Sequence, residues 1–305
     1  MFPVLFIPPE ASDSLEPLGT KPKFWFKGEH NIDCLFKETT LNTGEDWAEK
    51  IVSELCGFLG LPHVDYTLAE WQGKRGVVCG NFVPEGGRLV LGNELLARIN
   101  PKYPDQKRFG VRQYTLRRVL AIFRTRETQI KAPLNWTSFA GVTTALDVFI
   151  GYLLLDAWIA NQDRHHENWG LIVTPALTQH LAPSYDHASS LGRNETEHNR
   201  TDRLTTHDRG RSMDRYVARA KSAFFASPAR KQLLSTVEAF HEAGKVRPRA
   251  ANAWLQRLAA VSAHDVQQLF AKIPNDRITP VAVEFALKML ALNRQRLLAL
   301  HEALQ

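Results

Sequence analysis

Cysteine is scarce in this sequence. Its three cysteines, Cys34, Cys56 and Cys79, lie far apart and lack the close pairs of a zinc-binding motif. An odd number of isolated thiols argues against a disulfide framework and favours a reducing compartment. Low-complexity tracts are missing too, and 44% of the residues are hydrophobic and 23% charged. This composition is typical of a folded globular protein and excludes a disordered tail.

Long hydrophobic runs are also missing. The most apolar segment, residues 148–155, lies between Asp147 and Asp156, so it is too short to cross a bilayer and predicts a buried helix. The first ten residues are apolar, but they lack a basic leader and contain prolines, so we do not interpret them as a signal peptide. We therefore expect a cytoplasmic protein without membrane attachment.

The excess of basic residues is small. The sequence has 38 Lys and Arg residues against 32 Asp and Glu, a formal net charge of +6. This balance suits an anionic ligand such as a nucleotide, an acidic partner or nearby nucleic acid, and it equally serves solubility. The arginines between Arg112 and Arg126 belong to a segment with its own apolar face, which is typical of a solvated helix surface. No helix-turn-helix motif is visible, so we expect no direct nucleic-acid binding.

Strand patterns dominate residues 1–87. Short apolar runs separated by Gly-containing turns predict two hairpins, and an amphipathic segment between the hairpins predicts a helix. The expected elements are strands 23–27 and 32–37, helix 44–60, and strands 64–71 and 75–83.

Helix patterns dominate residues 88–305. The expected helices are 91–98, 113–128, 138–160, 213–225, 230–243, 250–261, 264–272 and 280–304. Short strands are expected around 168–173 and 180–186, and the charged segment 192–212 is expected to be a mobile loop. This segregation of strands and helices predicts an α+β fold with a small strand-rich N-lobe and a larger helical C-lobe.

The segment NQDRHHENWG, residues 161–170, places many polar groups directly after the predicted buried helix. Asp163 and Asn168 are five positions apart, which is the spacing of an Asp and an Asn in the protein-kinase catalytic loop. There the Asp accepts the proton of the attacking hydroxyl, and the Asn amide oxygen contacts a magnesium ion on the phosphates. Taken alone, such a pair would more often serve as turn and cap residues.

Three further residues fit this interpretation. Asp186 lies 18 residues after Asn168, a gap that allows a strand, a turn and a returning strand, and its carboxylate would suit magnesium. Lys37 ends a predicted strand directly before a helix, where a kinase-like lysine and its acidic partner would stand. We take Glu49 as that partner and Glu45 as the second choice.

Two other segments are expected to contact a nucleotide. Gly19, Thr20 and Lys21 precede the first strand pair, and their backbone N–H groups would face phosphate, although the segment is no Walker A motif. Asn81 and Phe82 lie at the predicted junction of the lobes, where the adenine is expected.

The histidines of the polar segment invite a zinc interpretation, but His165 and His166 lack the one-turn spacing of a zinc-binding helix. We expect His165 to be buried and hydrogen-bonded, and Arg164 to pair with a carboxylate or phosphate. The scattered histidines elsewhere are expected at the surface or in loops. They are His180, His187, His198 and His207.

Several segments of the sequence resemble a known protein family. DAWIANQDRHHENWGLIV and LAPSYDHASS resemble the HipA-like kinases of bacterial toxin–antitoxin modules, and GTKPKFWFK, LFKETT and GEDWAEKIVSELCGFLGLPH resemble their smaller, single-unit members. The resemblance spans the chain from about Leu18 to the C-terminal helix. It implies a bilobed protein-kinase-like fold, ATP and magnesium as cofactors, and phosphorylation of Ser or Thr on a protein.

The resemblance also implies roles for single residues. Asp163 would be the catalytic acceptor, Asn168 and Asp186 the metal ligands, and Lys37 a phosphate contact. Members often phosphorylate their own phosphate loop, and Thr20 is the hydroxyl at that place here. A translation component as substrate and an antitoxin as partner are further implications.

Two other functions remain open from the sequence. The DRHxxN pattern also resembles phosphoinositide-type lipid kinases, which are usually far longer and have a glycine soon after the metal-binding Asp, where this chain reads YDHASS. A non-catalytic binding protein with a kinase-like fold is the other alternative. Against this alternative, every polar group that catalysis needs is present in the sequence.

Overall fold

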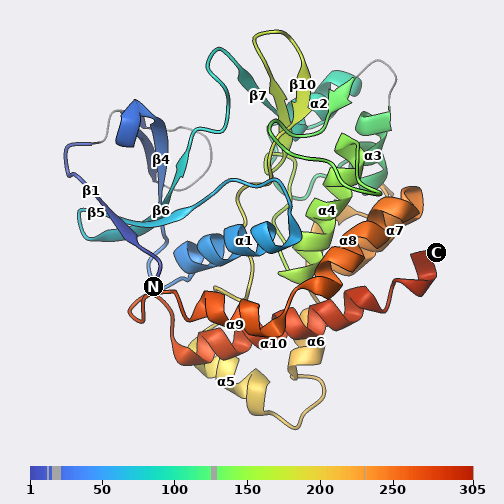
Figure 1. Ribbon diagram of the computed structural model, residues 1–305. Coiled ribbons are helices and arrows are strands. Elements are labelled where there is room, and N and C mark those ends of the chain that lie inside the picture. Colours follow the sequence, from blue (N-terminus) through green and yellow to red (C-terminus); the bar gives the residue numbers. More distant parts are fainter. Residues whose placement is uncertain (12–13, 16–21, 125–128, 230, 305) are drawn as a thin grey trace.

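The computed structural model describes residues 1–11, 14–15, 22–124, 129–229 and 231–304. Within these ranges, strands β1 (Val4–Ile7), β4 (Asp33–Glu38), β5 (Thr67–Trp71) and β6 (Lys74–Gly80) lie at the left of Figure 1, and most helices lie to the right and below. The predicted α+β class is therefore confirmed. The division into lobes at residue 87 stays a prediction. The next strand, Arg88–Leu91, pairs with the strand Gly170–Val173 and not with the strands before it.

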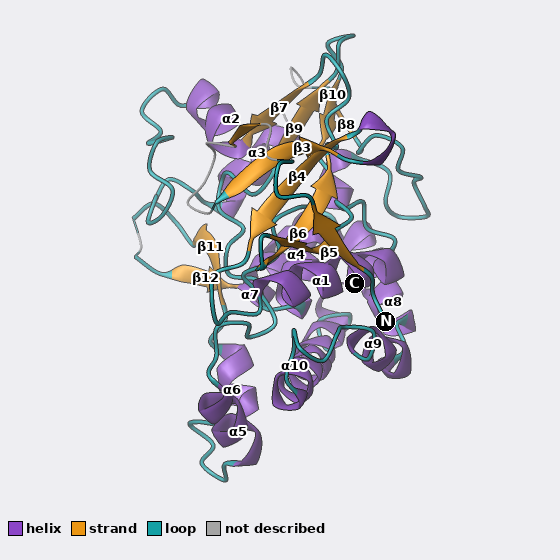
Figure 2. Ribbon diagram, turned by 90° about the vertical axis from the view of Figure 1, so that its left-hand side faces the viewer, coloured by secondary structure: helices purple, strands orange, loops and turns teal. Residues whose placement is uncertain are grey.

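A six-stranded sheet forms the strand-rich side (Figure 2). Its order is β1-β5-β6-β4-β3-β2, and both predicted hairpins are present. The strands are β1 (Val4–Ile7), β2 (Ser14–Leu15), β3 (Lys23–Lys27), β4 (Asp33–Glu38), β5 (Thr67–Trp71) and β6 (Lys74–Gly80). Strand β1 pairs in parallel with β5, and the sequence analysis had not predicted it. Residues two positions apart in a strand point to the same face of the sheet. Phe24 and Phe26 of β3 are therefore both buried in one cluster with Phe36 of β4.

Helix α1 (Glu45–Leu59), which was predicted over 44–60, lies beside this sheet. Its apolar stripe is buried, and Leu59 rather than Phe58 ends it, because Leu59 is 0% and Phe58 39% exposed. Gly60 ends the helix in the left-handed conformation, at φ 69°, which glycine adopts without strain.

Helix α4 (Ala145–Trp158) is the centre of the core. Every residue in it is buried, so it is apolar all round rather than amphipathic. Thr144 begins the helix by accepting a hydrogen bond from the Asp147 backbone, and Asp147 accepts one in return. The polar segment 161–170 follows two residues later, so its start is attached to a fully buried helix.

Two smaller sheets complete the strands. The four-stranded sheet has the order β7-β9-β10-β8, and the two-stranded one pairs β11 with β12. The strands are β7 (Arg88–Leu91), β8 (Ile130–Lys131), β9 (Gly170–Val173), β10 (Gln179–Leu181), β11 (Lys221–Phe225) and β12 (Leu233–Ser235). The strand and returning strand expected between Asn168 and Asp186 are therefore present as β9 and β10.

The remaining helices are α2 (Gly92–Ile99), α3 (Leu116–Arg124), α5 (Glu197–Thr205), α6 (Met213–Ala218), α7 (Thr236–Val246), α8 (Pro248–Ala260), α9 (Ala263–Phe270) and α10 (Pro280–Leu298), with short 3₁₀ turns at Glu29–Asn31 and Glu302–Leu304. Of these helices, α3, α7, α8 and α10 pack against α4. Among the helices described, none combines the length and the apolar character that a bilayer crossing needs.

Two predicted helices were wrong over part of their length. The helix expected over 213–225 ends at Ala218, and the helix expected over 230–243 begins only at Thr236, because β11 and β12 occupy the segments between. In β11, Ser222 and Phe224 are buried on one face, a period of two that a short apolar run does not distinguish from a helix.

The segment 192–212 was expected to be a mobile loop, and this was wrong for its middle. Helix α5 occupies Glu197–Thr205 and lies with α6 at the end of the molecule away from β7 (Figures 1 and 2). Its buried residue is Arg200, which donates to the Gly192 carbonyl oxygen at 3.1 Å. Because the buried residue of this helix is an arginine, its sequence lacks the periodic apolar residues by which an amphipathic helix is predicted.

Candidate active site

A buried ion pair anchors the polar loop to α4. The guanidinium of Arg164 donates to both carboxylate oxygens of Asp156, at 2.8 Å each, with side-chain exposures of 2% and 4%. A third hydrogen bond joins Arg164 to the Asn168 carbonyl oxygen at 2.9 Å. The expected pairing of Arg164 with a carboxylate is confirmed, and it ties both ends of the loop to the core.

Asp163 and Asn168 meet across this loop. The Asn168 side-chain nitrogen donates to the Asp163 carbonyl oxygen at 2.7 Å, so its amide oxygen is the atom that remains to accept. The Asp163 carboxylate accepts a hydrogen bond from the Ser189 hydroxyl at 3.3 Å. Burial and the nearby Asp186 carboxylate raise the pKa of Asp163 to about 6, because both disfavour its charged form.

Lys37 and Asp186 lie together although 149 positions separate them. The Lys37 ammonium is 2.8 Å from the Asp186 carboxylate and 3.5 Å from the Glu49 carboxylate. Burial alone would lower the pKa of Lys37, but the two carboxylates outweigh it and raise the pKa. Asp186 has a left-handed backbone, with φ 59°, which is strained for a residue other than glycine and is frequent at functional sites.

Glu49 holds both the lysine and the segment after Asp186. Its carboxylate accepts hydrogen bonds from the backbone N–H groups of His187 at 2.7 Å and Ala188 at 3.1 Å. Burial alone would raise the pKa of Glu49, but Lys37 and the hydrogen bond from His187 outweigh burial and lower it. The second choice, Glu45, instead contacts Arg193.

We expect Glu49→Gln to lower the free energy of unfolding by about 1–3 kcal/mol, because Gln keeps the shape but removes the charge that pairs with Lys37. The control is Glu54→Gln in the same helix, whose partner Lys50 is one turn away and whose side chain is 32% exposed. That change should cost no more than about 0.5 kcal/mol. Urea denaturation of both variants measures the difference, and equal losses would contradict the assigned role.

The histidines behave differently from one another. His165 is buried, as expected, and accepts a hydrogen bond from Arg108 at 2.9 Å. Burial and Arg108 lower the pKa of His165 to about 3, so this ring is neutral. His187 was expected at the surface or in a loop; it lies in a loop, but it is buried, with 0% exposure, and is bonded to the Ser184 hydroxyl at 2.7 Å. Its position directly after Asp186 is the signal that the sequence analysis missed.

A cavity of about 280 Å³ brings five predicted residues together. Lys37, Asn168 and Asp186 line its polar part, and Asn81 and Phe82 line its wall. The Phe82 ring stacks on Tyr185, with centroids 5.6 Å apart, and the sequence analysis had not singled out Tyr185. Three other predicted residues, Gly19, Thr20 and Lys21, lie outside the described residues.

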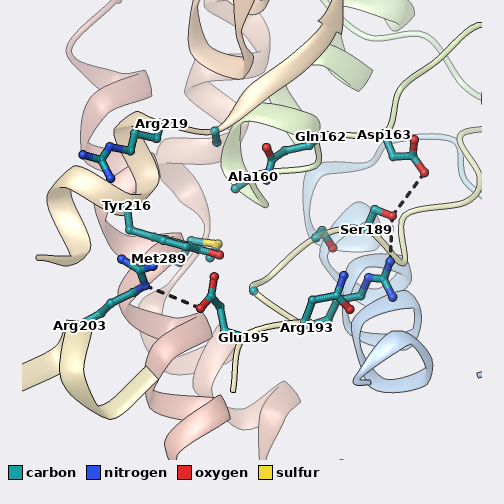
Figure 3. Close-up of a pocket in the computed structure, with 14 residues that line it drawn as sticks. Ala160, Gln162, Asp163, Ser189, Arg193, Glu195, Arg203, Tyr216, Arg219 and Met289 are labelled. Atoms are coloured by element: carbon teal, nitrogen blue, oxygen red, sulfur yellow. Dashed lines mark hydrogen bonds and ion pairs between the residues drawn. The ribbon is translucent and has the colours of Figure 1, made fainter. Parts of the chain in front are cut away.

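A second cavity, of about 640 Å³, opens on the Asp163 side of the loop (Figure 3). Asp163 and Ser189 lie at one end, Arg203 and Tyr216 at the other. Part of its lining comes from Gly192 to Glu195, so the segment that the sequence analysis interpreted as a loop borders the candidate catalytic residue.

The donors in the smaller cavity fit magnesium bound to a nucleotide. Within the described ranges, the protein has no cluster of three or more His, Cys, Asp or Glu side chains that could hold a metal ion by itself. A metal ion bound together with a nucleotide does not need such a cluster. Magnesium prefers oxygen ligands, keeps several waters and is usually held by one or two carboxylates together with phosphates. Asp186 and Asn168 supply oxygen donors of this kind, and Lys37 supplies a positive charge for phosphate.

The architecture belongs to the class of bilobed, protein-kinase-like folds. A crystal structure of the Helicobacter pylori proinflammatory kinase CtkA is similar over 99% of this chain and 98% of that chain, with a TM-score of 0.70 and 16% sequence identity. HipA from Shewanella oneidensis, solved with HipB and operator DNA, is similar over 95% of this chain and 67% of that chain, with a TM-score of 0.53 and 12% identity.

These similarities confirm the predicted fold and the resemblance to HipA-like kinases at the level of structure. No protein-family model and no curated protein matches the sequence.

Proposed function

We propose that this protein is an ATP-dependent Ser/Thr protein kinase of the HipA-like type. One observation carries the proposal: a rigid loop presents Asn168 to one cavity and Asp163 to another. Such an arrangement suits phosphoryl transfer, because the acceptor hydroxyl must attack the γ-phosphorus from the side opposite the leaving oxygen. The kinase-like fold of the solved structures described above supports it.

Each residue in the smaller cavity has a proposed task. Lys37 holds phosphate oxygens, Asp186 and Asn168 hold magnesium, and Asn81 and Phe82 border the adenine. Gly19, Thr20 and Lys21 remain the predicted phosphate loop, with Thr20 as the predicted site of self-phosphorylation. When bound, magnesium and ATP supply the transferable γ-phosphoryl group and neutralise its charge.

Asp163 orients the acceptor hydroxyl and takes its proton. A carboxylate whose pKa is raised to about 6 is charged at neutral pH and is still a stronger base than an ordinary Asp. Arg164 and Asn168 hold Asp163 in place, so the catalytic geometry exists before the acceptor arrives.

The acceptor is proposed to be a protein that enters the larger cavity and contacts the segment 192–212. HipA is solved with HipB and operator DNA, and we propose an antitoxin partner for this chain by analogy. A translation component as the substrate and a cytoplasmic location remain predictions, and no contact described here favours a lipid acceptor.

Magnesium and ATP together are expected to raise the free energy of unfolding by about 2.7 kcal/mol at about 100 times the Kd. ATP without magnesium should stabilise less. Asp186→Asn should lose the magnesium-dependent part, and Asp208→Asn, a change at an exposed residue away from both cavities, should keep it. Thermal unfolding measures these shifts.

Transfer of labelled phosphate from ATP to proteins of a cell extract, compared with lipid vesicles, separates a protein kinase from a lipid kinase. A protein that neither binds ATP nor transfers phosphate would contradict the proposal and favour the binding-protein alternative.

A further inference from the structure

Ser189 stands where an acceptor hydroxyl would stand. Its hydroxyl donates to the Asp163 carboxylate at 3.3 Å and accepts from the Arg193 guanidinium at 3.2 Å (Figure 3). A general base must lie within hydrogen-bond reach of the proton that it removes. The neighbouring Ser190 is directed elsewhere, because it is buried and donates to the His187 carbonyl oxygen at 2.7 Å. Of two adjacent serines, one is aimed at the candidate base.

The backbone around Ser189 is held firmly. On one side, the N–H groups of His187 and Ala188 donate to the buried carboxylate of Glu49. On the other side, the Leu191 N–H donates to the Ile159 carbonyl oxygen at 3.0 Å, at the end of α4. These bonds come from the core of the fold, so the position of Ser189 does not depend on its own long hydrogen bond to Asp163.

Arg193 is placed to receive a phosphate on Ser189. One of its terminal nitrogens contacts Glu45 and the other donates to the Ser189 hydroxyl. Its Nε is buried and has no hydrogen-bond partner within the described part of the chain. A phosphoserine adds about −1.5 to −2 charge and three acceptor oxygens, and an adjacent arginine is the usual partner for them.

We propose that Ser189 is a site of self-phosphorylation within one molecule, and that the phosphate then closes the larger cavity to other acceptors. This rests on the proposed function. The Ser189 oxygen forms a bond to the γ-phosphorus of ATP, the bond from that phosphorus to the bridging oxygen breaks, ADP leaves, and the hydroxyl proton passes to Asp163. The phosphate then lies between Asp163 and Arg193, where it excludes another hydroxyl from the base.

The test uses the purified full chain with magnesium and ATP, followed by peptide mass spectrometry. We expect phosphate on Ser189, at a fractional rate that does not change when the protein is diluted. Ser190→Ala should keep this modification, and Ser189→Ala should lose it. Phosphate that is absent from Ser189 while an added protein such as casein is phosphorylated would overturn the inference and leave the proposed function intact. The absence of any transfer together with the absence of ATP binding would overturn both.

The second half of the inference has its own measurement. Transfer to added casein should fall about 100-fold or more once Ser189 is fully modified, because the base is blocked. In Ser189→Ala the transfer should not decline with time. An unchanged rate after full modification would overturn the proposed closure.

Discussion

Replacing Asp163 by Asn is expected to lower phosphate transfer by roughly 10²–10⁴-fold while nucleotide binding persists. Asn has nearly the same shape and can still accept the hydrogen bond from Ser189, but it cannot take a proton from the acceptor hydroxyl. Asp163 does not line the smaller cavity, so the nucleotide contacts of Lys37, Asn168 and Asp186 remain. Initial rates of transfer to a protein acceptor and a separate ATP-binding titration measure the two effects.

Asp186→Asn provides the comparison for this prediction. Asp186 lines the smaller cavity and contacts Lys37, so its loss should weaken magnesium-dependent binding as well as transfer. Asp163→Ala should resemble Asp163→Asn rather than Asp186→Asn. Near-normal turnover in either Asp163 variant would contradict the role of Asp163 as the catalytic base.

Replacing Arg164 by Met is expected to lower the free energy of unfolding by about 3–5 kcal/mol. The reason is the buried carboxylate of Asp156, which would lose both hydrogen bonds from Arg164 and keep one, from the Asn161 side chain at 2.8 Å. A charge left without its partner in the core pays the desolvation penalty without compensation. Urea denaturation measures the loss.

Two variants control this second prediction. Arg117→Met, at an exposed position of α3, should change the free energy of unfolding by no more than about 0.5 kcal/mol. The double variant Asp156→Asn/Arg164→Met should recover part of the loss, because no charge remains buried at this place. A double variant less stable than Arg164→Met alone would show that the ion pair is not the source of the effect.

The elements predicted correctly are those with strong local signals. Helix α10 begins with Thr279 as its cap and Pro280 at its first position, and α1 ends at Gly60, so capping and glycine signals located these boundaries. The hairpin of β3 and β4 followed from a short turn between alternating apolar runs. In each case a few consecutive residues determine the local backbone.

The elements that were missed depend on distant contacts. Strand β1 is apolar but short, and it becomes a strand because β5 accepts it as a parallel neighbour. Helix α5 depends on Arg200, whose acceptor at Gly192 lies outside the helix. His187 is buried beside Ser184 and Glu49, and the contact with Glu49, 138 positions away, is one that local sequence does not reveal.

The sequence by itself determined the spacing of Asp163 and Asn168, because residues five positions apart in one tight loop meet through local geometry. It also placed Lys37 on a strand and Glu49 on the next helix, but it did not separate Glu49 from Glu45. Only the tertiary structure decided that choice, since the contacts from Lys37 to Glu49 and Asp186 depend on how a strand, a helix and a distant segment pack. The direction of the Ser189 hydroxyl was decided in the same way, because side-chain orientation follows from backbone restraints that residues far along the chain supply.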